Sequence, residues 1–259
     1  MLSEENINFL RSVIFDAGSF LIDAKVNTLS YKQDLSPVTN IDIQINSFLE
    51  SKLSYFNIPI LSEERKFIKY PNNDFWLIDP LDGTKNFING DGQCTINIAL
   101  MRNMKPIFGM VYAPFFDELY YGPLLNGEVL YINKGKLTSL ISSNKKKIKT
   151  HVSSKLHKEN FTLPSDFKLF TLGSSLKYVR IAKADYDFCI RTQGSSEWDI
   201  AACHPILKAL GGNIIDLNTK QEIRYNKNNF RNTSFLVFRS PFNFDTFESL
   251  LKDVLIYHE

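Results

Sequence analysis

The chain has 259 residues, of which 44% are hydrophobic and 22% charged; this is the usual mixture of a globular protein and excludes a disordered or low-complexity scaffold. Its 30 Lys and Arg residues against 28 Asp and Glu leave a net charge of +2, which is too balanced for a duplex-binding surface, so we expect no nucleic-acid partner. No apolar run approaches the roughly 18 residues that a membrane span needs.

The cysteines and the start of the chain bear on the cellular compartment. Cys94, Cys189 and Cys203 are widely spaced, so they form neither a disulfide framework nor a zinc cluster, which favours a reducing interior. The residues after Met1 lack the positive flank and apolar stretch of a secretory signal. We therefore expect a cytoplasmic protein without an integral membrane segment, and we leave open a peripheral attachment to the inner face of the cell membrane.

The first part of the chain predicts two helices followed by short strands. Ser3 is expected to cap the first helix, because its side chain can accept a backbone hydrogen bond and apolar residues then recur at helical spacing up to Leu21. A second helix is predicted from Ile41 to about Leu53. Short apolar runs predict strands at Ile58–Ser62 and Phe75–Ile78.

The later part alternates between strands and helices. Hairpins are predicted over Thr95–Tyr112 and around the turn dipeptide Asn126–Gly127. The polar, lysine-rich stretch from Ser139 to Lys149 is the predicted domain boundary. Beyond it the predicted elements are strands at Lys168–Leu172, at Phe188–Arg191, near Ile214 and at Phe235–Phe238, and helices at Ser175–Ala184, at Trp198–Leu210 and over a last segment that buries Phe247 to Leu255. This order predicts an N-terminal α+β domain over residues 1–145 and a C-terminal α/β domain over residues 146–259.

The densest chemical signal is the stretch Leu-Ile-Asp-Pro-Leu-Asp-Gly-Thr. An apolar strand runs into two carboxylates three residues apart, Asp79 and Asp82, and Pro80 is expected to end the strand because it has no ladder donor. Gly83 permits close backbone approach, so the two carboxylates and the Leu81 carbonyl can converge. Hard oxygen ligands without His or Cys select magnesium or manganese over zinc. An ordinary turn with capping acids is the alternative for an isolated Asp-x-x-Asp.

Two further carboxylates stand at the ends of predicted elements and strengthen the interpretation as a metal site. Glu63 follows the strand at Ile58–Ser62, and Asp199 lies at the start of the helix at Trp198. A carboxylate at a helix start is often only a cap or a partner of the helix dipole, so Asp199 by itself has both interpretations.

Four separated motifs together resemble the inositol monophosphatase superfamily, the lithium-sensitive, magnesium-dependent phosphomonoesterases. In chain order the motifs are Ser36–Asp42, Glu63–Glu64, Asp79–Thr84 and Trp198–Ala202. Four more segments are similar to the bacterial 3′(2′),5′-bisphosphate nucleotidases: Thr84–Phe87, Asn97–Leu100, Gly109–Pro114 and Gly173–Lys177. The resemblance implies a layered αβαβα sandwich (α+β / α/β) of the inositol monophosphatase and fructose-1,6-bisphosphatase type. It also implies removal of the 3′-phosphate from adenosine 3′,5′-bisphosphate, which yields AMP.

By the same resemblance the metal ligands are Glu63, Asp79, the Leu81 carbonyl, Asp82 and Asp199, the last donated by the C-terminal domain. Two or three Mg²⁺ ions per site are implied, with Mn²⁺ as a substitute and Li⁺ or Ca²⁺ as inhibitors. Asp42 and Thr84 resemble the pair that positions and deprotonates the attacking water. Glu64 is expected to face the substrate or to support a ligand rather than to bind metal.

The implied substrate-binding set is Glu63, Asp82, Gly83, Thr84, Ser174, Ser175, Lys177, Arg191 and Asp199. Ser174, Ser175 and Lys177 stand at a predicted helix start, where free backbone N–H groups and a cation suit an anion; simple helix capping is the alternative. Arg191 can pair with the second phosphate of the substrate, and an edge-strand salt bridge is its alternative.

Other functions stay open beside this one. An inositol or sugar phosphatase of the same fold is the alternative enzyme, whereas a non-catalytic nucleotide-binding module would have lost at least one of the acids. The chain is expected to act on a small-molecule substrate as a monomer or a homodimer. Pro205 departs from the family pattern and is expected to kink the helix at Trp198.

Overall fold

A computed structural model describes residues 2–24, 29–31, 37–65, 70–71, 73–145, 150–153, 168–192 and 195–247. The first main sheet has seven strands, in spatial order β3 (Ile60–Ser62), β4 (Phe75–Asp82), β5 (Thr95–Arg102), β6 (Lys105–Ala113), β7 (Glu118–Gly122), β8 (Val129–Asn133) and β9 (Lys136–Leu140). The second has six, in the order β11 (Lys168–Thr171), β10 (Thr150–Ser153), β12 (Phe188–Arg191), β15 (Phe235–Phe238), β13 (Asn213–Asp216) and β14 (Gln221–Glu222). A separate pair consists of β1 (Leu29–Tyr31) and β2 (Pro37–Thr39).

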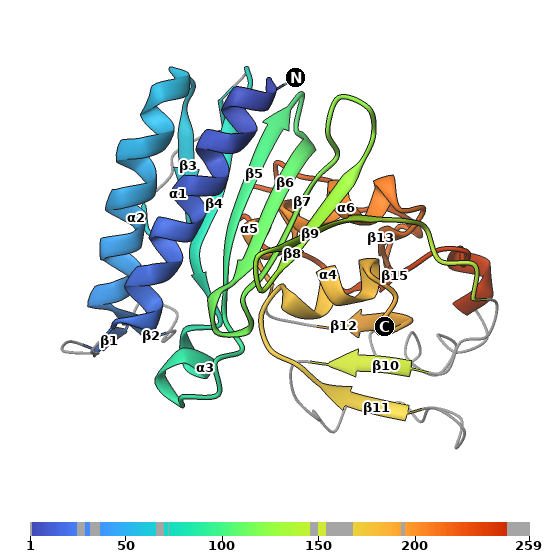
Figure 1. Cartoon of the computed structure of the whole chain (residues 1–259). Helices are drawn as coiled ribbons and strands as arrows, with labels where there is room; N and C mark the ends of the chain where they lie inside the picture. The colour runs from blue at the N-terminus through green and yellow to red at the C-terminus, as the bar shows by residue number, and fades with distance from the viewer. Residues whose placement is uncertain are drawn as a thin grey trace.

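The described helices pack on the faces or at the ends of these sheets (Figure 1). They are α1 (Glu4–Ile22), α2 (Asn40–Leu53), α3 (Thr84–Ile88), α4 (Leu176–Ala182), α5 (Trp198–Ala201) and α6 (Cys203–Ala209), with short 3₁₀ turns η1 (Ser54–Phe56) and η2 (Pro114–Phe116). Helices α1 and α2 lie on one face of the first sheet, and α4, α5 and α6 lie between the two sheets. On the far face of the second sheet, residues 244–247 are helical and Phe247 packs into the core. The layered αβαβα sandwich is therefore confirmed.

The outer helices form where the apolar periodicity predicted them. The Ser3 side chain accepts a hydrogen bond from the Asn6 N–H at 3.2 Å, so the predicted cap is present. The apolar face of α1 buries residues such as Leu10 and Ile14 in a core shared with α2 and with Trp76 of the first sheet. This layer holds the first turn of α2, which carries Asp42, against the sheet.

The middle layer contains a break in the predicted helix from Trp198 to Leu210. Helix α5 ends at Ala201, and α6 begins at Cys203. Pro205 lies in the first turn of α6, where a missing N–H is tolerated because first-turn N–H groups have no intrahelical partner. Ala202, the residue between the two helices, packs closely against Gly109 of β6. A Cβ atom at Gly109 would lie 1.8 Å from the Ala202 carbonyl oxygen, so the contact requires a glycine. The expected kink thus takes the form of two short helices.

Four other expectations have mixed outcomes. Both predicted hairpins are present, as β5–β6 and β7–β8. Strand β4 does not end at Pro80 but continues to Asp82, so that expectation was wrong. Strand β9 occupies the start of the stretch predicted as a domain boundary, and the division at residues 145 and 146 stays a prediction. The last predicted helix lies largely outside the described residues.

Within the described part of the chain, no helix combines the length and the apolar character that crossing a bilayer requires.

Candidate active site

A cavity of about 250 Å³ opens where the first sheet meets α4 and α5. Its wall consists of Glu63, Asp79, Leu81, Asp82, Gly83, Thr84, Lys85, Asn86, Ser174, Lys177, Tyr178, Arg191, Ser195 and Asp199. All the residues expected to bind metal lie on this wall. So do those expected to bind substrate, with the exception of Ser175.

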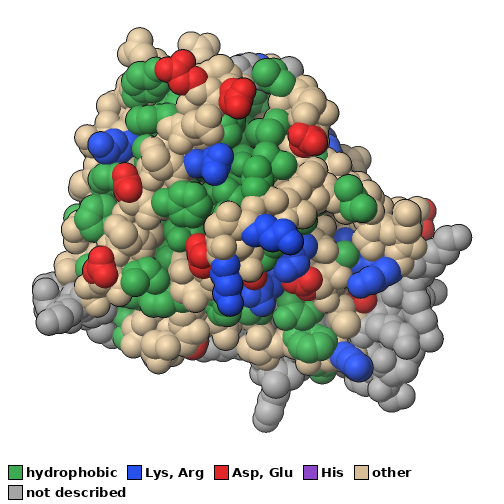
Figure 2. Space-filling model, in the orientation of Figure 1, with side chains coloured by type: hydrophobic (Ala, Val, Ile, Leu, Met, Phe, Trp, Pro, Cys, Tyr) green, Lys and Arg blue, Asp and Glu red, His purple; other side chains and the backbone are tan. Residues whose placement is uncertain are grey.

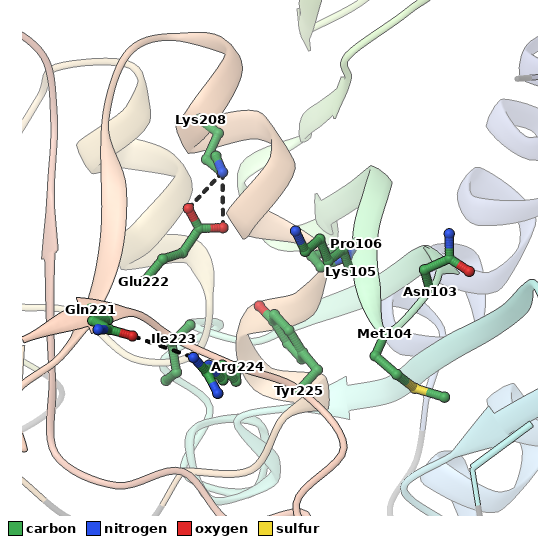
Figure 3. A pocket seen from close by; sticks show the side chains of 10 residues that line it. All are labelled: Asn103, Met104, Lys105, Pro106, Lys208, Gln221, Glu222, Ile223, Arg224 and Tyr225. Atoms are coloured by element: carbon green, nitrogen blue, oxygen red, sulfur yellow. Dashed lines mark hydrogen bonds and ion pairs between the residues drawn. The ribbon is translucent and has the colours of Figure 1, made fainter. Parts of the chain in front are cut away.

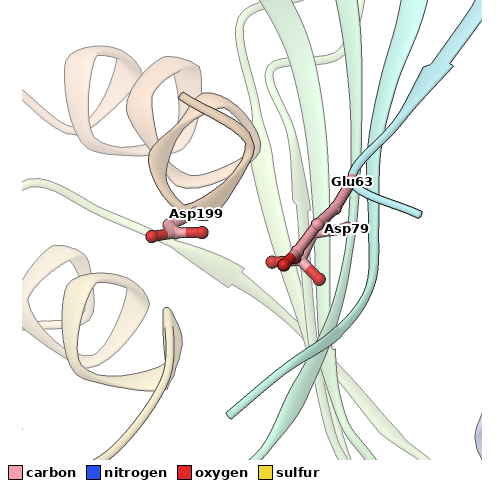
Figure 4. A group of neighbouring side chains, drawn as sticks. All are labelled: Glu63, Asp79 and Asp199. Carbon is pink, nitrogen blue, oxygen red and sulfur yellow. The ribbon is translucent and has the colours of Figure 1, made fainter. Parts of the chain in front are cut away.

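Three carboxylates from separate segments converge in this cavity. One ligand oxygen from each of Glu63, Asp79 and Asp199 lies within 4.8 Å of the others. The backbone N–H of Glu63 donates to the Ile78 carbonyl at 3.1 Å, which extends the parallel pairing of β3 with β4 and places Glu63 beside Asp79. Figure 4 shows Asp199 reaching from its helix toward the other two acids. The structure therefore brings together acids that are up to 136 positions apart in the printed sequence, from Glu63 to Asp199.

A bulge in β4 explains how Asp79 and Asp82 reach the same cavity. Residues three apart on a regular strand point to opposite faces of the sheet. Here Asp79 pairs with Asn97 and Asp82 with Thr95, so two residues of β4 oppose one residue of β5 between them. One of the two is Pro80, whose missing N–H fits the interrupted ladder. The proline thus re-aims the strand instead of ending it.

Asp42 and Thr84 form the hydrogen-bonded pair that the resemblance implied. The Thr84 hydroxyl lies 3.0 Å from Asp42 Oδ1 and 3.2 Å from the Leu81 carbonyl oxygen, so both oxygens are within its donating range. Asp42 Oδ2 accepts from the backbone N–H and the hydroxyl of Thr39, at 2.7 and 2.6 Å. The backbone bond belongs to a capping box at the start of α2, and the two bonds together fix the orientation of the Asp42 side chain.

Three acids of the cavity, Asp79, Asp82 and Asp199, have raised pKa values. Burial raises the pKa of Asp79 well above its usual range, and the negative charges of Glu63 and Asp82 raise it further. Burial and the charge of Asp199 raise the pKa of Asp82 to about 7, and burial with Glu63 raises that of Asp199 to about 6. Lys177 and Arg191 act in the opposite direction on Asp82. The cluster therefore holds more negative charge than its surroundings neutralise.

This donor set fits a divalent cation. The side-chain donors are all carboxylate oxygens, with the Leu81 carbonyl on the same wall, and such hard ligands suit Mg²⁺ or Mn²⁺. Asp79 Oδ1 accepts from the Leu81 N–H at 3.1 Å, but Asp79 Oδ2 is buried and has no hydrogen-bond partner among the described residues. A buried carboxylate oxygen of this kind is costly unless a cation or donor meets it.

The start of α4 differs from the expectation of free backbone donors. The Ser175 N–H donates to Asp82 Oδ2, so it is not available to an anion. The Ser175 side chain lies behind the wall of the cavity, with its hydroxyl 2.7 Å from Asn97 Oδ1. Ser174 has a left-handed backbone, φ 48°, and its carbonyl accepts from the Lys177 ammonium group. Lys177 is 4% exposed, and burial lowers its pKa.

Several residues on the cavity wall were not predicted as site residues from the sequence. Lys85 and Asn86 follow Thr84 directly and could have been included by proximity to the motif. Tyr178 and Ser195 carry no signal in the sequence, because an apolar helix and a Ser-Ser pair are ordinary. Among the described histidines, His204 is buried away from the cavity wall and hydrogen-bonded to Tyr225, and burial lowers its pKa to about 4. All three cysteines are buried, and none of them takes part in a disulfide bond.

A larger hollow of about 510 Å³ lies elsewhere, between the β5–β6 turn, α6 and β14 (Figure 3). Its charged residues include Lys208 and Glu222, whose side chains pair at 2.6 Å. Figure 2 shows Lys and Arg side chains gathered near the centre of the face drawn in Figure 1, with acidic side chains among them. Neither feature contains, among the described residues, a cluster of acids like that of the smaller cavity.

Comparisons with known proteins agree with this geometry. The sequence profile of the inositol monophosphatase family matches residues 3–243. The 3′(2′),5′-bisphosphate nucleotidase CysQ of Buchnera aphidicola subsp. Acyrthosiphon pisum is 36% identical over 208 residues, which are 73% of this chain and 75% of the relative. The crystal structure of CysQ from Bacteroides thetaiotaomicron superposes with a TM-score of 0.77 at 25% identity, covering 92% of this chain and 98% of that one. The IMPase of Thermotoga maritima, 22% identical, gives a TM-score of 0.80 over 98% of this chain and 100% of that one. The chain therefore belongs to the inositol monophosphatase family.

Proposed function

We propose that the chain is a metal-dependent 3′(2′),5′-bisphosphate nucleotidase, which hydrolyses adenosine 3′,5′-bisphosphate to AMP and phosphate. Metal dependence is typical of the family. Curated relatives of this activity share 31–36% identity with most of the chain. The observation that carries the proposal is the convergence of Glu63, Asp79 and Asp199 in one cavity, beside a hydroxyl that is bonded to a buried carboxylate.

The residues that would hold the metal are Glu63, Asp79, Asp82, Asp199 and the Leu81 carbonyl. When bound, divalent cations stabilise the charge on phosphoryl oxygens and lower the pKa of a coordinated water. Four acids suffice for two or three Mg²⁺ ions, and Mn²⁺ has the same ligand preference. We expect Li⁺ and Ca²⁺ to inhibit, since neither reproduces the charge and size of Mg²⁺ together.

Thr84 and Asp42 would move the proton of the attacking water. The hydroxyl of Thr84 can donate to Asp42 Oδ1, and its oxygen can then accept a hydrogen from a water in the cavity that Thr84 lines. Asp42 Oδ2 is held by two donors from Thr39, so Oδ1 keeps its orientation toward Thr84. A positioned base of this kind typically contributes about 10²- to 10⁴-fold in rate.

Lys177 and Arg191 would hold the second, non-reacting phosphate of the substrate. Both line the cavity, and both are close enough to Asp82 to lower its pKa. A guanidinium pairs with phosphate oxygens in a planar, bidentate manner, while the ammonium group acts as a point charge. An inositol monophosphate lacks a second phosphate and would not make this contact.

Phosphate release by the purified full chain tests the proposal. With Mg²⁺ present, we expect adenosine 3′,5′-bisphosphate to be hydrolysed with a kcat/KM at least tenfold above that for inositol 1-phosphate, and we expect EDTA to abolish both reactions. A clear preference for inositol 1-phosphate would replace the nucleotidase with the inositol phosphatase. Binding of the bisphosphate without release of phosphate would leave only a binding module.

A further inference from the structure

A buried carboxylate, Glu197, stands two residues before Asp199 and is not used by the proposed chemistry. Its side chain is 0% exposed. Its backbone begins α5, because the Glu197 carbonyl accepts from the N–H groups of Ile200 and Ala201 at 3.3 and 3.0 Å. Whatever holds Glu197 therefore also holds the first turn of the helix that carries Asp199.

Four donors satisfy this carboxylate. Oε1 accepts from the backbone N–H of Lys227 at 3.0 Å and from its ammonium group at 3.1 Å. Oε2 accepts from the Asn226 N–H at 3.1 Å and from the hydroxyl of Tyr70. A buried charge with two donors on each oxygen and a cation beside it is strongly fixed, since breaking any of these bonds leaves a desolvated charge.

Tyr70 connects this hydrogen-bond network to the first sheet, because it lies between Glu63 and Asp79 in the chain. Its ring packs against Phe75 of β4, with centroids 5.6 Å apart, and against Phe230, at 4.9 Å. Burial and the charge of Glu197 raise the pKa of Tyr70, so its hydroxyl stays protonated and remains a donor. The Tyr70–Glu197 bond therefore links a residue that packs on the strand presenting Asp79 to the first turn of the helix presenting Asp199.

A second set of hydrogen bonds holds Asp199 and the two serines before Glu197. Asn232 donates from its side chain to the Ser196 carbonyl at 2.6 Å and from its backbone to the Ser195 carbonyl at 2.9 Å. The Ser196 N–H in turn donates to Asp199 Oδ2 at 2.8 Å. The residues before Asp199 are thus held on both sides, and the direction of its carboxylate follows from theirs.

We propose that Glu197 and Tyr70 are positioning residues, which hold Asp199 at the distance from Glu63 and Asp79 that a shared divalent cation requires. The proposal rests on the metal site of the proposed function. Asp199 is the ligand that comes from a different layer of the fold, and without cation the three acids repel one another. A helix free to shift would relieve that repulsion by moving Asp199 away. Partners that orient metal ligands typically contribute about 10- to 100-fold in metal affinity.

The decisive experiment measures Mn²⁺ binding to the metal-free protein by electron paramagnetic resonance, which does not depend on turnover. The variant is Tyr70→Phe, which removes one hydroxyl and keeps the ring. We expect the Kd for Mn²⁺ to rise about tenfold. The Mg²⁺ concentration that gives half-maximal phosphate release should rise in parallel, while kcat at saturating Mg²⁺ stays within about threefold of the wild type.

Tyr120→Phe is the matched control. Tyr120 is also a buried tyrosine, and its hydroxyl donates to a buried glutamate, Glu118, at 2.9 Å, but this pair lies on β7 and its residues are not on the cavity wall. The two variants should lose comparable stability, as measured by Tm, and only Tyr70→Phe should lose metal affinity. An unchanged Mn²⁺ affinity in Tyr70→Phe, or an equal loss in Tyr120→Phe, would overturn the proposal.

Glu197→Gln provides a second variant that keeps the shape of the side chain and removes its charge. We expect a larger loss of Mn²⁺ affinity than in Tyr70→Phe; a folded Glu197→Gln protein with wild-type affinity would contradict the proposal. Should Glu197→Gln fail to fold, Tyr70→Phe still decides the question. A wild-type protein that binds Mn²⁺ but releases no phosphate would refute the nucleotidase, and the Mn²⁺ comparison would still test the positioning role.

Discussion

Two buried carboxylates near the same cavity have opposite surroundings. Glu197 accepts four hydrogen bonds and lies beside the Lys227 ammonium group. Asp79 is equally buried, but its Oδ2 has no hydrogen-bond partner among the described residues, and Glu63 and Asp82 add negative charge around it. Both carboxylates are buried, so they differ only in how far neighbouring donors and cations compensate the buried charge. A carboxylate whose charge the protein satisfies supports structure, whereas one left unsatisfied among other acids is prepared for a cation.

The largest expected effect comes from Asp79→Asn, which keeps the shape of the side chain and removes its charge. We expect phosphate release at saturating Mg²⁺ to fall by about 10³-fold or more, because a ligand that stabilises charge in the transition state is lost. Asp82→Asn should behave in the same way. Circular dichroism should show an unchanged fold in both variants. An active Asp79→Asn enzyme would show that catalysis does not need the Asp79 charge. The functional difference between Asp79 and Glu197 would then no longer hold.

The next effect concerns the hydroxyl that faces the cavity. Thr84→Ala removes the donor to Asp42 and should reduce kcat by about 10²- to 10⁴-fold with a small change in KM. Thr84→Ser keeps the hydroxyl and should retain most of the activity. Steady-state kinetics on the two variants separates a proton-transfer role from simple packing. Equal losses in both variants would point to packing of the Thr84 methyl group instead.

Removing the charge of Asp79 and removing that of Glu197 should also have opposite effects on the stability of the metal-free protein. At pH 8, Asp79→Asn should raise Tm by a few degrees because it removes repulsion, and Glu197→Gln should lower it by about 5 °C or more because it breaks a compensated network. Thermal unfolding in EDTA measures both shifts. If both substitutions destabilise the protein to the same extent, the acids of the cavity are compensated after all.

The pH dependence of the metal-free protein follows from the raised pKa values. The folded state holds protons on Asp82 up to about pH 7 and on Asp199 up to about pH 6, whereas the unfolded chain releases them near pH 4. Their protonation therefore favours folding fully below about pH 4, and this contribution is lost as the pH rises to about 7. Unfolding scans in EDTA should show Tm falling across this window. Saturating Mg²⁺ should reduce the slope, since metal binding replaces the protons.

The smallest effect is expected at the larger hollow. Lys208→Met breaks the half-exposed pair with Glu222, and pairs of this kind contribute about 0–1 kcal/mol. We expect kcat, KM and Mn²⁺ affinity to stay at wild-type values, with a change in Tm of no more than a few degrees. A tenfold loss of activity in Lys208→Met would show that this hollow takes part in function.

Sequence patterns predicted the elements best where periodicity is local. The helix from Ser3 has the expected cap, and strands β12 and β15 have the predicted bounds, because one buried face or one short apolar run determines each of them. The prediction at Pro80 was wrong, because a bulge accommodates a residue without a ladder donor. Pro205 was expected to kink the helix at Trp198, and two short helices stand there, because the Ala201 carbonyl finds no N–H at Pro205. The contact between Ala202 and Gly109, by contrast, depends on a distant strand.

The sequence by itself determined which oxygen-bearing residues this protein has and the short segments that present them, because motifs, caps and apolar periods act over a few neighbouring residues. The family resemblance already implied one metal site for Glu63, Asp79 and Asp199, and the tertiary structure brings them into one cavity. Only the tertiary structure decided that the Ser175 hydroxyl turns away from this cavity and that Tyr70 and Glu197 meet. These contacts join segments up to 136 positions apart, from Glu63 to Asp199. Their geometry follows from how the layers pack around buried charge, which no local pattern records.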